Sequence, residues 1–195
     1  MGHYFINDSN LKSNIQEFEI KFFDNQFKFK TDNGVFSKGE LDFGTSLLIE
    51  TVLKEELKGI GLDLGCGYGP IGIILSKLKK VDMDMIDVNH RAIHLTKENI
   101  RLNKVNSNAF VSDGYLNVNR KYDFIVSNPP IRVGKEKLYN LIREAKNYLS
   151  EDGIIYLVIR KEQGAKSFIK DFSLYYEISV LDKSKGFYII SLKSC

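Results

Sequence analysis

From residue 60 onward, short apolar runs alternate with longer segments of helical period, and this alternation constrains the fold more than any other feature. The expected strands are 60–64, 81–87, 108–112, 122–127 and 154–160, and the expected helices are 70–79, 90–103, 135–149 and 164–172. Repeated strand–helix units form a mostly parallel sheet with helices on its faces. The last of these strands is apolar at nearly every position, which is typical of a strand buried on both faces. The sequence therefore predicts an α/β fold.

The two ends of the chain depart from this alternation. Residues 17–31 alternate apolar and charged side chains on either side of a turn, which predicts a small β-hairpin. Its phenylalanines are expected in the core, with stacking on nucleotides as the alternative. Residues 175–181 and 187–192 flank another turn and predict an antiparallel hairpin at the C-terminal end. We therefore expect an N-terminal hairpin extension over 1–40 and one larger α/β domain over 41–195.

Two helix starts are marked by their residues. A helix is expected from about Asp42 or Thr45 to Lys54, with Thr45 or Ser46 as its N-cap. Pro70 stands in the first turn of the helix at 70–79, where its missing N–H group is not needed.

Composition excludes several classes of protein. With 195 residues, 43% of them hydrophobic and 27% charged, the chain has the composition of one globular domain. No apolar run approaches the roughly 20 residues that span a bilayer. The first residues carry no signal-peptide pattern, so we expect a cytoplasmic protein. Cys66 and Cys195 form no metal or redox spacing, and Cys66 is either a reactive thiol or a small side chain in a tight turn.

The charge pattern permits a polyanionic partner without requiring one. The net charge is +3, and basic residues gather in two places, one early in the chain and one after residue 131. The first cluster is Lys28, Lys30 and Lys38, and the second is Arg132, Lys135 and Lys137. Such clusters are consistent with a nucleic-acid interface or with solvated faces. The sequence leaves the oligomeric state open.

A glycine-rich turn follows the first strand of the α/β region. It comprises Asp63-Leu64-Gly65-Cys66-Gly67-Tyr68-Gly69, and Pro70 stands where a dinucleotide-binding fingerprint has its third glycine. A pyrophosphate favours a helix N-terminus without nearby negative charge. A ligand with sulfonium and ammonium groups is instead attracted by a carboxylate such as Asp63. The motif therefore predicts that such a ligand binds at Gly65, Gly67 and Gly69, with a purely structural turn as the alternative.

A second acidic residue supports this interpretation. Asp87 ends the next strand and stands 22 residues beyond Gly65. An acid about 20 residues past the first glycine, at the end of the neighbouring strand, reaches the ribose hydroxyls of a bound nucleoside. Asp82 and Asp84 come earlier on that strand and are expected to face solvent. Asp113 ends the third strand and either accepts a hydrogen bond from an adenine amine or is a turn residue.

An Asn-Pro-Pro turn follows the strand at 122–127, and Pro129 and Pro130 restrict the backbone around Asn128. An exocyclic amine on an aromatic base is a weak nucleophile because its lone pair is delocalised into the ring. Two acceptors, the Asn128 side-chain oxygen and the Pro129 carbonyl, can draw the amine towards tetrahedral geometry, while positioning supplies most of the acceleration. The turn therefore predicts catalysis of methyl transfer to a planar nitrogen by Asn128, Pro129 and Pro130, with a structural Asn-Pro turn as the alternative.

These motifs resemble those of the class I S-adenosyl-L-methionine-dependent methyltransferases, in the group called "methyltransferase small". The resemblance covers residues 3–193, and the stretch 34–48, which includes Phe-Ser-Lys-Gly-Glu-Leu-Asp-Phe-Gly-Thr, is more specific than the glycine turn. The chain is most similar to the RsmC-type enzymes, which methylate guanine N2 in small-subunit (16S) ribosomal RNA. The resemblance implies a Rossmann-like seven-stranded sheet whose last strand is antiparallel. It also implies S-adenosyl-L-methionine as cofactor, bound in part by Thr45, and ribosomal RNA or the small ribosomal subunit as partner, with Phe36 near the base.

Two features depart from the family pattern. Many amino-methyltransferases follow Asn-Pro-Pro with an aromatic residue that stacks on the target base, whereas this chain has Ile131. Stacking must then be weaker or come from elsewhere, with Phe36 as a candidate, and Ile131 and Arg132 are candidate substrate contacts. The longer family members carry a further N-terminal methyltransferase-like domain, which we do not expect here. The hairpin and the basic clusters would then dock the substrate.

Other functions stay open. In a rival interpretation the same Asn-Pro-Pro geometry serves methylation of adenine N6 or of a protein glutamine amide, which Ile131 and the stretch 34–48 disfavour. An NAD-dependent oxidoreductase is disfavoured by Pro70 and by the Asn-Pro-Pro turn. A non-catalytic RNA-binding module is disfavoured because Asp63, Asp87 and Asn128 are all intact.

A weaker signal lies on the helix at 90–103. His90 and His94 stand four residues apart, with Glu98 one turn further on, and zinc can use such a spacing. Because no further ligand cluster stands out, we expect surface histidines and no metal site.

Overall fold

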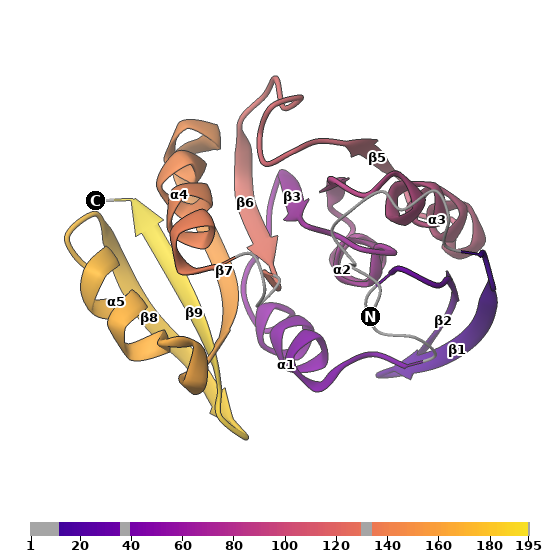
Figure 1. Ribbon diagram of the computed structural model, residues 1–195, viewed down its shortest axis with the longest axis horizontal. Helices are drawn as coiled ribbons and strands as arrows, with labels where there is room; N and C mark the ends of the chain where they lie inside the picture. Colours follow the sequence, from indigo (N-terminus) through magenta and orange to yellow (C-terminus); the bar gives the residue numbers. More distant parts are fainter. Residues whose placement is uncertain (1–11, 36–39, 130–133, 195) are drawn as a thin grey trace.

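The strands and helices follow the predicted alternation (Figure 1). The computed structural model describes residues 12–35, 40–129 and 134–194. The strands are β1 (Gln16–Phe22), β2 (Asn25–Thr31), β3 (Ile60–Leu64), β4 (Asp82–Asp87), β5 (Ser107–Val111), β6 (Tyr122–Ser127), β7 (Leu149–Arg160), β8 (Tyr176–Ser184) and β9 (Phe187–Ser194). The α-helices are α1 (Phe43–Val52), α2 (Pro70–Lys79), α3 (His90–Asn103), α4 (Lys135–Ala145) and α5 (Ala165–Phe172), and the 3₁₀ helices are η2 (Lys146–Tyr148) and η3 (Lys161–Gln163).

Among the described residues, seven strands form one sheet in the order β5-β4-β3-β6-β7-β9-β8. Strands β5, β4, β3, β6 and β7 run parallel to one another, whereas β9 is antiparallel to both β7 and β8. The predicted Rossmann-like fold, with its antiparallel last strand and its small N-terminal hairpin, is confirmed. The chain order reverses at β3, which lies between β4 and β6, and the carboxyl ends of strands at such a point border a crevice.

The hydrophobic core has two parts, as expected for a sheet that is covered on both faces. In β4, Met83 and Met85 belong to the part that includes residues of α1, α2 and α3, whereas Ile86 belongs to the part formed with α4 and α5. The β1–β2 hairpin lies beside α3 at one end of the molecule, and β8 and β9 lie at the other end (Figure 1).

The hairpin is joined to α3 through both apolar and polar contacts. Phe27 and Phe29 are buried in the core, as predicted. Asn99 pairs its side-chain amide with the backbone N–H and C=O groups of Lys30, at 2.7 and 3.0 Å. The Asn99 amide also donates to the carbonyl of Tyr68 at 2.8 Å. One side chain of α3 therefore links the hairpin to the glycine turn, while the predicted domain boundary near residue 40 stays a prediction.

The start of α1 differs from the prediction. Asp42, rather than Thr45 or Ser46, is the N-cap, so that prediction is wrong. The carboxylate of Asp42 accepts hydrogen bonds from the N–H groups of Gly44 at 3.1 Å and Thr45 at 3.2 Å. An aspartate that reaches two free N–H groups at the helix N-terminus starts the helix one turn earlier.

Asp84 was predicted to face solvent, and that prediction is wrong. Its side chain is buried because β4 lies between β3 and β5 with both faces covered. The hydroxyl of Tyr122 donates to its carboxylate at 2.9 Å, and Arg120 lies 3.7 Å from the same oxygen. A paired, hydrogen-bonded carboxylate can occupy a buried position that an isolated one could not.

The segment after α4 also differs. The predicted helix at 135–149 ends earlier, and β7 already begins at Leu149 rather than at Ile154. Tyr122 of β6 pairs with Leu149 and Phe124 pairs with Ile154, so the intervening polar residues form an irregularity in β7. The chain therefore returns to the sheet before its apolar run begins.

Candidate active site

A cavity of about 530 Å³ lies at the carboxyl ends of the central strands. It is lined by residues that follow β3, β4, β5 and β6, together with residues from α1, α4 and the β7 and β9 ends. A volume of this size is in the range that holds nucleoside-sized ligands. It is the point of the fold where the strand order reverses, which is where open α/β sheets bind ligands.

The glycine turn presents bare backbone to this cavity. The N–H groups of Gly65 and Cys66 both donate to the carbonyl of Ile86 at 2.9 Å, which fixes the turn against β4. Gly65 and Gly67 line the cavity with φ angles of 76° and 58°, and a Cβ atom added at either would meet no atom of the described residues within 4 Å. The space beside these two glycines is therefore open to a ligand.

Asp63 and Gly69, the two ends of the glycine turn, are not among the residues that line the cavity. Gly69 is the N-cap of α2 and has no side chain to cap it, and the Asp63 carboxylate accepts instead from the N–H of Gly72 at 2.9 Å. Asp63 is fully buried, and its Oδ1 has no hydrogen-bond partner in the part of the chain that the structure describes. Burial, opposed by the Gly72 bond and reinforced by the Asp87 charge, raises the pKa of Asp63 to about 7.

Asp87 lines the cavity beside the glycine turn. Its two carboxylate oxygens accept from the N–H groups of Gly67 and Asn89, each at 2.9 Å. Burial raises the pKa of the Asp87 carboxyl despite these bonds. Asp113 also lines the cavity, but its side chain is exposed and lies 3.4 Å from the ammonium of Lys137.

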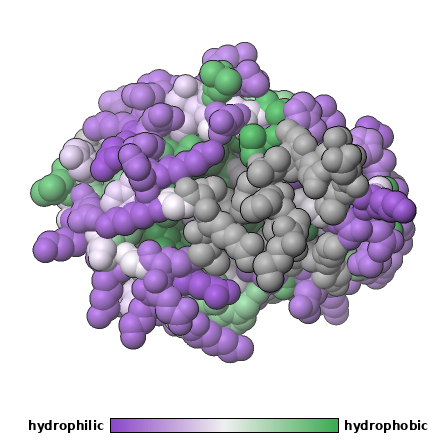
Figure 2. Space-filling view, viewed as in Figure 1, coloured by the Kyte–Doolittle hydropathy of each residue, from purple (hydrophilic) through white to green (hydrophobic). Residues whose placement is uncertain are grey.

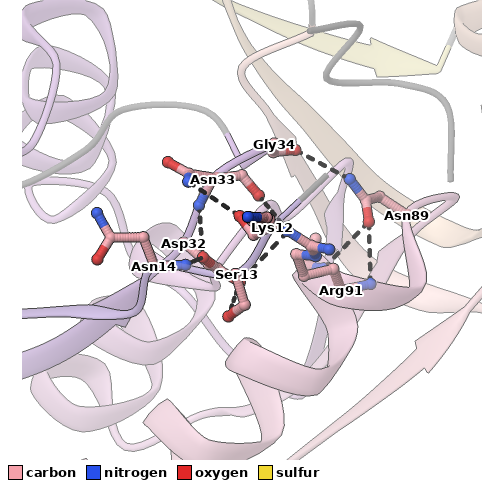
Figure 3. A network of polar contacts seen from close by, with 9 residues as sticks. Lys12, Ser13, Asn14, Asp32, Asn33, Gly34, Asn89 and Arg91 are labelled. Atoms are coloured by element: carbon pink, nitrogen blue, oxygen red, sulfur yellow. Dashed lines mark hydrogen bonds and ion pairs between the residues drawn. The ribbon is translucent and has the colours of Figure 1, made fainter. Parts of the chain in front are cut away.

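Asn89 connects this edge of the cavity to the N-terminal segment (Figure 3). It caps α3 by accepting from the N–H of Arg91 at 2.9 Å, and its Nδ2 donates to the carbonyl of Gly34 at 3.1 Å. Arg91 donates to the carbonyl of Asn33 at 2.9 Å and lies 3.5 Å from the Asp32 carboxylate. Sequence reasoning missed Asn89, although an asparagine directly before a helix is a capping signal.

Asp32 is the centre of this network. Burial alone would raise the pKa of its carboxyl, but hydrogen bonds from the Asn14 N–H, the Ser13 hydroxyl and the Asn33 N–H outweigh burial and lower that pKa. The network therefore anchors the chain just before residue 36 at the edge of the cavity. Phe36, which was predicted to contact the base, lies outside the described residues.

Cys66 contacts α3 from within the glycine turn. Its side chain is buried and lies 3.7 Å from the hydroxyl of Thr96, and burial raises the pKa of the thiol well above its ordinary value. Thiols of this kind are poor nucleophiles, which favours the small-side-chain interpretation over a reactive one. The Thr96 hydroxyl also donates to the carbonyl of Gly67 at 2.8 Å.

The Asn-Pro turn borders the same cavity from β6. Because β6 pairs with β3, Asn128 and Pro129 follow the sheet next to the glycine turn. Asn128 Nδ2 donates to the hydroxyl of Thr45 at 2.8 Å, and Thr45 in turn donates to the Asp42 carboxylate. Thr45, predicted to bind a cofactor, thus lines the cavity in direct contact with the Asn128 amide. Pro130, Ile131 and Arg132 lie outside the described residues.

An aromatic and cationic wall completes the cavity. Phe187 and Arg160 line it, and the guanidinium carbon of Arg160 lies 4.5 Å from the centre of the Phe187 ring. Phe43, at the start of α1, packs against Phe187 with a centroid distance of 5.5 Å. Sequence reasoning missed this wall because its members come from α1, β7 and β9, and no local motif joins them.

Residues 26–191, most of the chain, match the methyltransferase small domain family. The chain belongs to that family. The resemblance to this family, inferred from the glycine turn and the Asn-Pro-Pro turn, is thereby confirmed. The predicted cofactor, S-adenosyl-L-methionine, is in keeping with this family, and one solved structure of the same fold contains AdoMet.

Several relatives of this methyltransferase domain are informative. The chain is 42% identical to the uncharacterized protein YbxB of Bacillus subtilis (strain 168), over 98% of both chains. It is 35% identical to ribosomal RNA small subunit methyltransferase C of Aliivibrio fischeri, over 73% of this chain and 43% of that protein. The chain therefore spans less than half the length of that ribosomal RNA methyltransferase.

Solved structures show the same fold. A 16S rRNA N2 methyltransferase (RsmC) of T. thermophilus, in complex with AdoMet and guanosine, matches with a TM-score of 0.82 at 20% identity, over 93% of this chain and 51% of that one. The ribosomal protein L11 methylase of Lactobacillus delbrueckii subsp. bulgaricus matches with a TM-score of 0.70 at 21% identity, over 82% of this chain and 81% of that one.

Proposed function

We propose that this chain transfers a methyl group from S-adenosyl-L-methionine to the exocyclic N2 amine of a guanine in small-subunit (16S) ribosomal RNA, in the cytoplasm. One observation carries the proposal: the glycine turn and Asp87 share one cavity with Asn128 and Pro129. The relatives named as ribosomal RNA methyltransferases support the substrate class. None of the helices in the described ranges has the length and apolarity to cross a bilayer.

The cofactor side of the cavity fits S-adenosyl-L-methionine. Gly65 and Gly67 would hold it against open backbone, and the Asp87 carboxylate would accept from its ribose hydroxyls. Asp63, one oxygen of which lacks a partner among the described residues, would add negative potential when ionised, and Asp113 would accept from the adenine amine. When bound, this cofactor supplies an electrophilic methyl group on a sulfonium.

On the acceptor side, Asn128 Oδ1 and the Pro129 carbonyl would accept hydrogen bonds from the two hydrogens of the target amine. These bonds draw the nitrogen out of conjugation with the ring and hold it in line for attack. The amine becomes acidic once the new N–C bond forms, so no titrating side chain is needed to remove its proton. The half-buried position of Asn128 at the cavity wall supports this role.

Phe187 would supply the stacking surface that Ile131 cannot. Its ring lines the cavity and contacts the Phe43 ring and the Arg160 guanidinium. Single-stranded bases that are splayed out of a helix stack on aromatic and guanidinium planes of this kind.

The two basic clusters in the sequence are less available to RNA than their residue types suggest. Lys28 pairs with Glu19 at 2.8 Å, Lys30 with Glu98 at 3.2 Å, Lys135 with Asp171 at 3.5 Å and Lys137 with Asp113 at 3.4 Å. Neutralised lysines contribute little to phosphate binding, because forming a phosphate contact requires breaking an existing ion pair. Lys38 and Arg132 lie outside the described residues.

A different group of cations lies at the β8–β9 turn and at the end of β7, where Arg160 lines the cavity. It comprises Arg160, Lys161, Lys183 and Lys185, which we name the turn cations. Among the described residues, no carboxylate forms an ion pair with any of them. Figure 2 shows hydrophilic side chains over the end of the molecule where this turn lies in Figure 1. The turn cations would contact phosphates next to the target nucleotide.

The test is methyl transfer from labelled cofactor to naked 16S ribosomal RNA, assembled small subunits and a protein release factor in parallel, followed by nucleoside analysis. We expect label in N2-methylguanine. Asn128→Ala should retain cofactor binding and lose about 100-fold or more in turnover, whereas Asn106→Ala, at an exposed amide away from the cavity, should behave as wild type. Label in N6-methyladenine or in the protein would refute the guanine assignment. RNA binding without methyl transfer to any of the three substrates would refute the enzymatic function and favour a non-catalytic RNA-binding module.

A further inference from the structure

The starting observation is a chain of hydrogen bonds that ends on a carboxylate. Asn128 Nδ2 donates to Thr45 Oγ1 at 2.8 Å, and the Thr45 hydroxyl donates to Asp42 Oδ2. Thr45 is 4% exposed, so water does not compete for its hydroxyl. The other oxygen of Asp42 caps α1 through the N–H groups of Gly44 and Thr45.

The direction of the protons along this chain follows from chemistry. An ionised carboxylate only accepts hydrogen bonds, so the single hydrogen of the Thr45 hydroxyl is committed to Asp42. The Thr45 oxygen then has only lone pairs to offer, and the group that meets it must be a donor. Asn128 must therefore turn its NH₂ towards Thr45 and its Oδ1 away from it. The positions of the oxygen and nitrogen of an asparagine amide follow from its hydrogen-bond network, which here fixes them through Thr45.

We propose that Asp42 and Thr45 are positioning residues that hold the Asn128 amide with its oxygen, and not its nitrogen, towards the target amine. The proposal rests on the function proposed above, because it assigns a cause to the acceptor role of Asn128. Among the described residues, no side chain or backbone group donates to Asn128 Oδ1, which leaves this oxygen for the substrate. The site is thereby specific for a substrate group that donates a hydrogen bond to Asn128 Oδ1. It rejects a group that can only accept, such as a carbonyl or an unprotonated ring nitrogen.

The consequence of losing the chain is a loss of rate rather than of cofactor binding. Without the Thr45 hydroxyl, the amide can rotate and direct its NH₂ at the target amine, which replaces an attraction by a repulsion between two donors. One misplaced hydrogen bond of this type in the reacting geometry corresponds to a decrease of about 10- to 100-fold in rate. The contacts of Gly65, Gly67 and Asp87 on the cofactor side stay in place.

The experiment compares Thr45→Val, which keeps the shape and removes the hydroxyl, with Thr45→Ser, which keeps the hydroxyl. Single-turnover methyl transfer to small-subunit RNA, calorimetric affinity for S-adenosyl-L-methionine and the thermal midpoint are measured for each. We expect Thr45→Val to lower the single-turnover rate by about 10- to 100-fold without weakening cofactor affinity, and Thr45→Ser to restore most of the rate. Ser46→Ala, whose hydroxyl contacts Glu50 on the exposed side of α1, is the matched control.

A double-mutant cycle separates positioning from general damage. If Thr45 acts through Asn128, Thr45→Val should have no further effect on rate in the Asn128→Ala background. Asp42→Asn preserves the helix cap but offers the Thr45 hydroxyl either an accepting oxygen or a donating NH₂ group, so it should give an intermediate rate. This variant keeps the test informative if Thr45→Val is unstable. Unchanged turnover in Thr45→Val refutes the inference while the proposed function stands. Loss of cofactor affinity in Thr45→Val also refutes it and assigns Thr45 to the cofactor, whereas an inactive wild type refutes the proposed function itself.

Discussion

Replacing Asp63 by Asn removes a buried carboxyl whose ionisation opposes folding. Asp63 is fully buried under the glycine turn, and one of its oxygens accepts from the N–H of Gly72 while the other has no partner in the described part of the chain. Burial and the neighbouring Asp87 raise its pKa from 3.8 to about 7. The folded state therefore holds this proton more tightly than the unfolded state does.

The sign and size of the effect follow from this difference. Because the pKa is higher in the folded state, the contribution of Asp63 to stability is greatest at low pH and is lost as pH rises towards about 7. At 1.36 kcal/mol for each pKa unit, the full difference is on the order of 4 kcal/mol. Between pH 5 and 7, the stability of wild type relative to Asp63→Asn should fall by about 1.4 kcal/mol per pH unit.

Urea unfolding at several pH values between 5 and 8 measures this difference, since the variant cannot titrate at this position. Asp82→Asn, at an exposed carboxylate of β4, is the matched control for the loss of one negative charge. Saturating S-adenosyl-L-methionine should flatten the wild-type slope, because nearby positive charge favours the ionised carboxyl. A difference between wild type and Asp63→Asn that is flat with pH would show that the buried carboxyl does not resist ionisation, and the reasoning would fail.

Three further predictions concern binding. Asp87→Ala should weaken cofactor affinity by about 10- to 100-fold, because it removes the proposed acceptor for ribose hydroxyls and the carboxylate that accepts from the Gly67 N–H in the glycine turn; calorimetry measures this, and unchanged affinity would contradict it. Phe187→Ala should raise KM for RNA, in line with roughly 1–3 kcal/mol per stacked base, while cofactor affinity stays the same; a variant with wild-type KM would exclude stacking there. Lys183→Gln and Lys185→Gln should each reduce the slope of log affinity for single-stranded RNA against log salt by about 0.7, whereas Lys28→Gln, already paired with Glu19, should leave it unchanged. Equal slopes in all three variants would remove the turn cations from the interface.

Local sequence signals were enough where a single segment determines its own structure. The α/β alternation predicted most elements because apolar period and turn residues act within a few neighbours. The glycine turn and the Asn-Pro turn were identified for the same reason, since positive φ angles and a stiffened backbone belong to the residues themselves. Where these signals were weak, as at the cap of α1 or the start of β7, the prediction was wrong.

Other features depend on contacts between distant segments, and no local pattern reports them. Asp84 looked like a solvent-facing residue of β4, but the covering of both faces of the sheet buries it against Tyr122. The chain from Asn128 through Thr45 to Asp42 exists only because β6 ends beside the start of α1. The wall of Phe187 and Arg160 likewise requires β9 to lie next to β7. The sequence by itself thus determined most of the elements and the local geometry of two turns, because these are set by neighbouring residues. Only the tertiary structure decided which side chains share the cavity and which cations lack a carboxylate partner among the described residues, because such contacts arise when packing joins segments far apart in the chain.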